Sequence, residues 1–209
     1  EWIIDAKGMA KLIADNKGKL ALFDARPGKF FPEGHIEGAV SNYDAKFAKN
    51  VAKLPKDKNQ LVVFYCGGPT WRLSPSSASK AEQLGYTNIK VFRGGLPAWK
   101  KAKKIVYTTT EFIKKFAKSP KSVVVLDVRA KASVQKGHIK GAYTIPLSEL
   151  KAAKTKMPKK KSAPIVLYAD NNQDAIKAFK IVRKWGYKNT SVLEGGLASW
   201  KKSGNALNQ

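Results

Sequence analysis

The chain has 209 residues, of which 43% are hydrophobic, and this length and composition allow one large domain or two small ones. No stretch reaches the roughly 18 consecutive apolar residues of a membrane-spanning helix, so we expect no membrane span. Forty basic residues against 15 acidic ones give a net charge of +25, but only five of the basic residues are arginine and the lysines are spread along the whole chain. This pattern favours a solvated lysine surface over a nucleic-acid site, and the charge should attract small anions.

The first hundred residues alternate between strand patterns and helix patterns. Apolar, β-branched runs predict strands at residues 20–24, 39–40, 61–65 and 89–92. Helical patterns are found at residues 6–14, 45–52, 75–84 and 97–101. Strands that alternate with helices indicate an α/β fold, in which helices cover both faces of a parallel sheet. In such a sheet, catalytic and ligand-binding residues usually lie at the carboxyl ends of the strands.

The second half of the chain repeats the first. The motifs that recur 103 positions later are Asp24-Ala25-Arg26, Gly34-His35-Ile36-Glu37-Gly38-Ala39 and Tyr65. Further along the offset becomes 101, and Gly94-Gly95-Leu96-Pro97-Ala98-Trp99 recurs as Gly195-Gly196-Leu197-Ala198-Ser199-Trp200. The sequence therefore predicts two copies of one domain, at residues 1–103 and 104–209. The second copy has strand patterns at 123–127, 165–168 and 191–193, and a capping box from Thr108 to Glu111 is expected to open its first helix.

The only cysteine of the chain, Cys66, follows the buried strand predicted at residues 61–65. Ser74 and Pro75 have the residue types of an N-cap and a first helical residue, so Cys66 should lie in a loop that leads into a helix N-terminus. The peptide N–H groups of such a loop and the helix dipole favour a thiolate and attract an anion. We therefore predict a reactive cysteine, although a lone cysteine is more often a small core residue.

The equivalent loop of the second copy has no thiol. Ala169 occupies the position of Cys66, and the loop is two residues shorter. Asp170 and Asp174 would repel an anionic substrate from this loop. We therefore expect the second copy to be catalytically silent.

The silent copy is also an internal control for other candidate residues. His35 and Arg26 are the residue types of a catalytic site, yet the silent copy keeps them as His138 and Arg129. A residue that persists where no nucleophile remains more often holds the fold, and we interpret both residues in this way. The segment from Cys66 to Arg72 is found in the first copy alone.

The chain resembles the rhodanese family, and specifically its tandem sulfurtransferases. The resemblance rests on Asp-x-Arg followed by Gly-His-Ile-x-Gly-Ala, on a cysteine that ends a central strand, and on Gly-Gly-Leu-x-x-Trp at the end of the domain. It implies two tandem rhodanese-like domains, each with a central parallel sheet flanked by helices. It also implies transfer of sulfane sulfur through a cysteine persulfide. The active copy is commonly the second in this family, whereas here it is the first.

The resemblance implies a role for each residue of the cysteine loop. Cys66 would be the nucleophile that carries the persulfide, and Arg72 would favour the thiolate and the charge that develops during transfer. The peptides that would cradle the anion are those of Gly67, Gly68, Thr70, Trp71 and Arg72. The expected partners are a small anionic sulfur donor, such as thiosulfate, and a thiol or cyanide acceptor. This scheme needs neither a metal nor an organic cofactor.

Two other functions stay open. Cys66 and Arg72 have the Cys-x5-Arg spacing of cysteine-dependent phosphatases, and rhodanese-fold phosphatases have enlarged loops; against this, Pro69 removes one backbone donor from the cradle. The chain could also be a sulfur carrier or binding module that does not turn over, and whose lysine surface recognises an acidic partner. Since the sequence begins at Glu1 and is rich in lysine, we expect a periplasmic or otherwise exported protein, with a cytoplasmic one as the alternative. The oligomeric state is not predicted.

Overall fold

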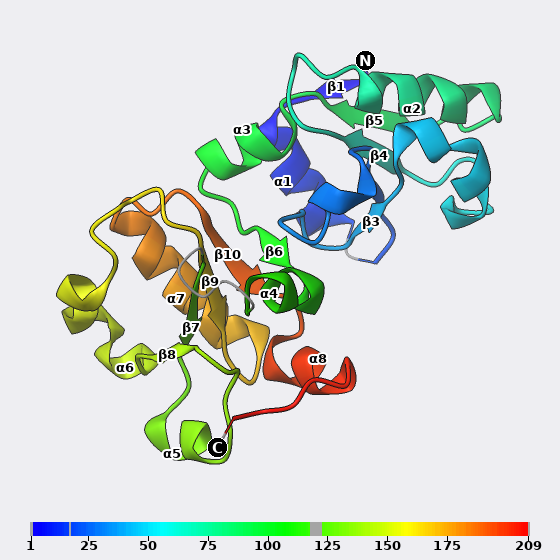
Figure 1. The fold of residues 1–209 in the computed structure, drawn as a ribbon. Helices are drawn as coiled ribbons and strands as arrows, with labels where there is room; N and C mark the ends of the chain where they lie inside the picture. The colour runs from blue at the N-terminus through cyan, green and yellow to red at the C-terminus, as the bar shows by residue number, and fades with distance from the viewer. Residues whose placement is uncertain (1, 17, 118–122, 209) are drawn as a thin grey trace. The chain divides into compact units, whose positions relative to one another are not determined.

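The computed structural model describes residues 2–16, 18–117 and 123–208, and the chain divides into two compact units (Figure 1). Unit 1 comprises Glu1–Phe31 and His35–Lys104. Unit 2 comprises Pro32–Gly34 and Ile105–Gln209.

Each unit contains a five-stranded sheet in which all paired strands are parallel. The strand order is β1-β5-β4-β2-β3 in unit 1 and the equivalent β6-β10-β9-β7-β8 in unit 2. The strands of unit 1 are β1 (Ile3–Ile4), β2 (Ala21–Asp24), β3 (Ala39–Ser41), β4 (Val62–Tyr65) and β5 (Ile89–Phe92). Those of unit 2 are β6 (Tyr107–Thr108), β7 (Val124–Asp127), β8 (Tyr143–Thr144), β9 (Ile165–Tyr168) and β10 (Thr190–Leu193). The predicted α/β class, with two tandem domains, is confirmed.

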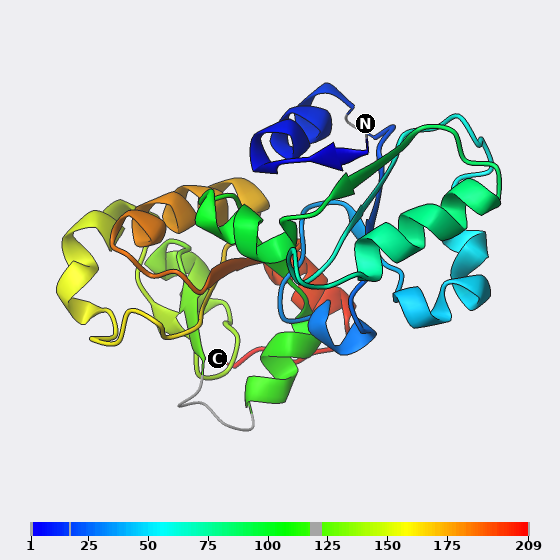
Figure 2. The ribbon, with the colours of Figure 1, turned by 90° about the horizontal axis from the view of Figure 1, so that it is seen from above.

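Helices cover both faces of the sheet in unit 1, where α1 and α2 lie on opposite sides of the strands (Figure 2). The helices of unit 1 are α1 (Ala6–Asp15), α2 (Leu73–Gln83) and α3 (Gly95–Lys101), with short 3₁₀ helices at Gly28–Phe30, Asp44–Lys46 and Ala48–Lys53. Those of unit 2 are α4 (Thr110–Ala117), α5 (Lys131–Gln135), α6 (Leu147–Leu150), α7 (Asn172–Lys184) and α8 (Gly196–Lys202), with a 3₁₀ helix at Lys151–Lys156.

The central strand of unit 1, β4, is buried along its whole length. Phe64 packs in one apolar cluster with Ala78 and Ala81 of α2. Because successive side chains of a strand point to opposite faces, the neighbouring Tyr65 points away from α2. Two-sided burial of this kind explains why the strand reads as a continuous apolar run.

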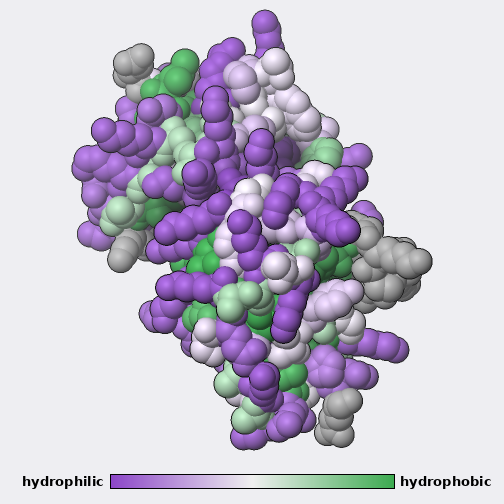
Figure 3. Space-filling model, turned by 90° about the vertical axis from the view of Figure 1, so that its left-hand side faces the viewer, coloured by the Kyte–Doolittle hydropathy of each residue, from purple (hydrophilic) through white to green (hydrophobic). Residues whose placement is uncertain are grey.

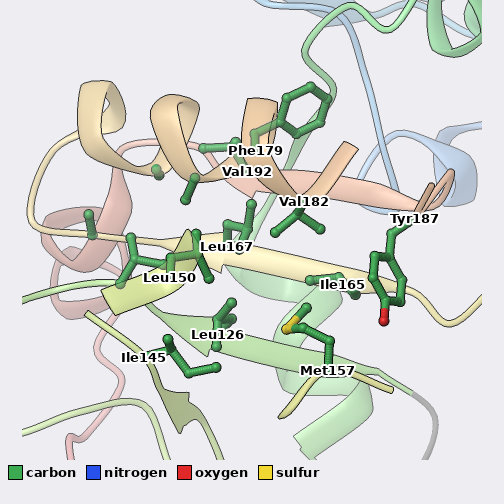
Figure 4. Packing of buried hydrophobic residues seen from close by; sticks show 14 of the residues in the cluster. Leu126, Ile145, Leu150, Met157, Ile165, Leu167, Phe179, Val182, Tyr187 and Val192 are labelled. Atoms are coloured by element: carbon green, nitrogen blue, oxygen red, sulfur yellow. The ribbon is translucent and has the colours of Figure 1, made fainter. Parts of the chain in front are cut away.

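Unit 2 has the same layers. Figure 4 shows Phe179 and Val182 of α7 packed over Ile165 and Leu167 of β9, and all four side chains are buried. Trp200 of α8 belongs to a second buried cluster. The sheet is thus covered by apolar side chains on both faces, as in unit 1.

Two predicted helix starts are wrong. Helix α2 begins at Leu73 rather than at Pro75, and its N-cap residue is Arg72, without a side-chain cap. Thr108 does not cap α4, because it lies in β6 and its hydroxyl donates a hydrogen bond to Pro32 O at 2.7 Å. The predicted helix at residues 45–52 is a pair of 3₁₀ helices.

Within the described residues, no helix is both long enough and apolar enough to cross a bilayer. Hydrophilic side chains dominate the face drawn in Figure 3, and the hydrophobic ones form small separate areas. This surface follows from the 40 lysine and arginine residues of the chain.

Candidate active site

Cys66 directly follows β4 and lies at the carboxyl end of the middle strand of unit 1, with its side chain fully buried. Its carbonyl oxygen accepts a hydrogen bond from the N–H of Leu96 in α3, at 3.1 Å. This approach requires glycine at position 95, where the backbone has φ +56° and an added Cβ would lie 2.1 Å from Cys66 O. The end of β4 and the start of α3 therefore fix the cysteine backbone together.

Within the described part of the chain, three polar groups lie close to the sulfur of Cys66. The Ser74 hydroxyl, in the first turn of α2, donates a hydrogen bond to Sγ across 3.1 Å. The thiol can donate its proton to the carbonyl oxygens of Gly68 and Trp71, each 3.6 Å from Sγ. The sulfur therefore has one hydrogen-bond donor and two acceptors close to it.

The loop from residue 66 to residue 72 folds back over the sulfur. The N–H of Trp71 donates to Gly68 O at 3.1 Å and closes a turn, in which Gly68 has φ +131°. The indole of Trp71 lies over Gly67 so closely that a Cβ there would be 2.8 Å from the ring. The same indole meets the Phe30 ring edge-on, with 5.9 Å between the centroids. The indole therefore covers the loop, and Trp71 as a residue is 36% exposed.

Of the predicted site residues, Gly68 and Trp71 have backbone atoms close to the sulfur. Gly67, Gly68 and Trp71 are within the fold of the loop around Cys66, but the Trp71 amide is already used by Gly68 O. Thr70 and Arg72 have exposed side chains. An anion cradle of peptide N–H groups would therefore require the two carbonyl groups that face the sulfur to rotate away from it.

Sequence reasoning missed the role of Ser74, which it interpreted as an N-cap. The side chain turns inward to the sulfur, and the helix begins one residue before it. The available signal was the repeat, because the second copy has Ala175 at this position, just as it has Ala169 in place of Cys66. The serine is therefore present in the copy that has the thiol and absent from the copy that lacks it.

Asp24 and Arg26 form a buried ion pair at the end of β2. The Arg26 Nε and Asp24 Oδ1 atoms are 2.9 Å apart, and the Tyr65 hydroxyl donates to Asp24 Oδ2 at 3.0 Å. Burial, followed by the charge of Asp24, raises the pKa of Tyr65 well above its usual value. Burial lowers the pKa of Arg26, but the hydrogen bonds and charge of Asp24 outweigh it, so that this pKa is raised.

Unit 2 contains the same arrangement without a cysteine. The Tyr168 hydroxyl donates to Asp127 Oδ2 at 2.6 Å, and Arg129 Nε lies 3.0 Å from Asp127 Oδ1. In unit 1, the His35 ring is buried, stacks on Phe31 at 4.1 Å and contacts Phe31 O through Nδ1 at 3.1 Å. These contacts agree with the interpretation that the repeated residues hold the fold.

The loop that replaces the cysteine loop in unit 2 is short. Three residues, 169–171, separate β9 from α7, whereas seven, 66–72, separate β4 from α2. Asn171 caps α7 by accepting from the N–H of Asp174 at 3.1 Å, and Asp170 Oδ1 lies 3.4 Å from the Arg129 guanidinium. These groups, with Ala169, line a hollow of about 320 Å³. The difference exceeds the two deleted residues because α7 also begins earlier.

Two tandem α/β units, each with a five-stranded parallel sheet and one with a buried cysteine at its carboxyl edge, define a two-domain protein with a single thiol site. The family model "Rhodanese-like domain" matches residues 5–102 and again residues 108–203. The chain therefore belongs to the rhodanese-like family, as its motifs predicted.

Individual relatives match parts of the chain. The uncharacterized protein YqhL of Bacillus subtilis is 34% identical over 97 residues, which are 46% of this chain and 74% of that protein. The uncharacterized protein slr1261 of Synechocystis is 32% identical over 83 residues, 40% of this chain and 45% of that protein. A solved thiosulfate sulfurtransferase of Pseudomonas aeruginosa is 18% identical, with a TM-score of 0.45, and the match covers all of this chain and 44% of that one. At that TM-score the likeness supports no statement about activity.

Proposed function

We propose that this chain transfers sulfane sulfur from a small anionic donor, such as thiosulfate, to a thiol or cyanide acceptor through a persulfide on Cys66. The observation that carries the proposal is the position of Cys66, the only thiol of a rhodanese-like chain, at the carboxyl end of the central strand and at the start of a helix. Strand ends of this kind are where α/β sheets bind ligands.

The proposed reaction has two half-reactions. The Cys66 thiolate attacks the outer sulfur of thiosulfate, the bond between the two donor sulfurs breaks, and sulfite leaves with the electron pair. A nucleophilic acceptor then attacks the outer sulfur of the persulfide, and cysteine leaves as thiolate. The exposed Arg72 and the lysine surface draw the anionic donor towards the loop. Neither half-reaction has a step that calls for a metal or an organic cofactor.

The loop geometry around Cys66 does not favour the phosphatase alternative. A phosphate cradle needs the peptide N–H groups of the Cys-x5-Arg loop to point at one centre. Around Cys66, two carbonyl oxygens face the sulfur instead, and the Trp71 N–H is bonded to Gly68 O. In the proposed first half-reaction the negative charge starts on Sγ, next to the hydroxyl of Ser74, and ends on the outer sulfur of the persulfide and on sulfite.

Intact-mass measurement after incubation with thiosulfate tests the proposal. We expect the wild-type mass to rise by that of one sulfur atom, and cyanide to remove this sulfur as thiocyanate. Cys66→Ser should show neither change. An unmodified wild-type mass with donor in excess would refute the proposal. Thiocyanate formation that stops after one turnover would indicate a carrier, and faster hydrolysis of an aryl phosphate would indicate a phosphatase.

A further inference from the structure

Several positions inside unit 1, one of them in contact with Cys66, are polar where the equivalent positions of unit 2 are apolar. Backbone hydrogen bonds establish which positions correspond. The N–H of Asn42 donates to Asp24 O at 2.9 Å, as the N–H of Ile145 donates to Asp127 O at 3.0 Å. Two residues further on, the N–H of Asp44 has a partner equivalent to that of Leu147. Asn42 and Asp44 therefore correspond to Ile145 and Leu147 in geometry as well as in sequence.

Five polar residues of unit 1 have apolar counterparts in unit 2. The pairs are Asn42 and Ile145, Asp44 and Leu147, Ser74 and Ala175, Ser77 and Ala178, and Lys80 and Ile181. All five apolar counterparts, together with Ala169, belong to or pack against one hydrophobic cluster of unit 2. The same region of the fold is thus an apolar core where the thiol is missing and a polar wall where it is present.

Within this polar wall, Ser74 contacts the reacting atom. Its side chain is fully buried, and its hydroxyl donates to Cys66 Sγ at 3.1 Å. The carbonyl oxygens of Gly68 and Trp71 bind a thiol proton but repel a thiolate or a persulfide anion. The hydroxyl is therefore the donor already in place when the sulfur becomes negative.

Asp44 holds the helix that carries this serine. Its carboxylate accepts hydrogen bonds from Ser76 at 3.1 Å and Ser77 at 2.8 Å, and Lys80 Nζ lies 2.9 Å from Oδ1. Ser77 is one helical turn after Ser74, on the same face of α2. A contact that fixes Ser77 therefore also fixes the direction in which the Ser74 hydroxyl points.

We propose that Ser74 is a catalytic residue that stabilises the anionic sulfur of Cys66 by a hydrogen bond, and that Asp44 is the residue that positions it. This inference rests on the proposed function. In the first half-reaction the hydroxyl donates to Sγ before attack. After the S–S bond of the donor has broken and sulfite has left with the electron pair, the hydroxyl donates to the persulfide.

Ser74→Ala tests the catalytic role, and the fold accepts alanine at the equivalent Ala175. Loss of a hydrogen bond to a charged group should lower the rate of thiocyanate formation about 10- to 100-fold, mainly in kcat. The rate at which iodoacetamide alkylates Cys66 at pH 7 should fall with it. Ser74→Thr, which keeps the hydroxyl, should retain most of both rates. Ser79→Ala, on the same helix, is the matched control and should change neither rate.

A double-mutant cycle tests the positioning role. Asp44→Ala should lower the transfer rate in the wild-type background and have little further effect in the Ser74→Ala background, because both changes remove one hydrogen bond to sulfur. A merely structural role would give the same loss in both backgrounds, and that result would overturn the assignment of Asp44. Unchanged transfer and alkylation rates in folded Ser74→Ala would overturn that of Ser74. If thiosulfate fails to load the wild-type protein, the proposed function fails, but the alkylation rates still decide the role of Ser74.

Discussion

Alanine at Gly95 should disable the thiol site, whereas alanine at the equivalent Gly196 should leave it working. Both glycines have φ +56°, a conformation that residues with a Cβ rarely adopt. An added Cβ would lie 2.1 Å from the carbonyl oxygen of Cys66 in unit 1 and 2.4 Å from that of Ala169 in unit 2. The two substitutions therefore apply the same perturbation to a loop with a thiol and to a loop without one.

The structure sets the size of the effect. Backbone strain at a left-handed position costs about 1–3 kcal/mol, and loss of the hydrogen bond from Leu96 N–H to Cys66 O costs about 1 kcal/mol more. A loss of about 2–4 kcal/mol should lower the melting temperature of the altered unit by about 10–30 °C. In Gly95→Ala the displaced peptide is that of the nucleophile, so transfer should also fall by about 100-fold while the protein is still folded.

Calorimetry and transfer rates measured on both variants provide the test. We expect each variant to lose stability in one unit, and only Gly95→Ala to lose activity at a temperature where circular dichroism shows that it is folded. If Gly196→Ala lowers transfer as much as Gly95→Ala, or if folded Gly95→Ala transfers sulfur at the wild-type rate, the argument from the Cys66 peptide is wrong.

Three further predictions concern the equivalent residues of the two units. Tyr65→Phe should lower the free energy of unfolding by about 2 kcal/mol, because Asp24 loses a hydrogen bond; equal urea midpoints for variant and wild type would contradict this. Burial and the neighbouring carboxylates raise the pKa of Tyr65 and Tyr168. The stability that these two tyrosines contribute is therefore complete below about pH 10 and is lost as the pH rises above it. Urea titrations at pH 8 and pH 11 should show that the double Phe variant loses less stability at the higher pH than the wild type does. Ala169→Cys in a Cys66→Ser background should give a thiol that does not support sulfur transfer. Measurable thiocyanate formation by this variant would show that the short loop is sufficient for transfer.

The longer strands could be predicted from sequence because two-sided burial leaves a clear pattern. β4 and β9 are continuous apolar runs, and the structure places both in the middle of their sheets. The two-residue edge strands β1, β6 and β8 were missed, since two residues are too few to show a period. β1 and β6 each pair with the last strand of their unit, and β8 pairs with β7; these contacts depend on the folded sheet and not on the local sequence.

The candidate site was only partly predictable for a similar reason. The place of Cys66 follows from the end of a buried strand, which local sequence can show. The direction of the Ser74 side chain does not, because a serine near a helix start can cap the helix or turn inward, and the buried sulfur decides between the two. Asp44 was likewise beyond prediction, since its partners Ser77 and Lys80 are more than 30 positions away in the sequence.

The polar wall of unit 1 should reduce the stability of this unit, and a substitution of Asn42, which belongs to this wall, can measure part of the cost. Its side chain is fully buried, and among the described residues neither its Nδ2 nor its Oδ1 has a hydrogen-bond partner. A buried unsatisfied polar group costs about 1–3 kcal/mol, and functional sites are where such costs persist. Asn42→Ile, which introduces the residue found at Ile145, should therefore raise the free energy of unfolding of unit 1 by about 1–2 kcal/mol. Urea denaturation would decide the question, with Ile145→Asn in unit 2 as the reciprocal variant. A loss of stability in Asn42→Ile would show that the amide is satisfied in solution, and no loss in Ile145→Asn would show that an amide at this position of the fold costs little.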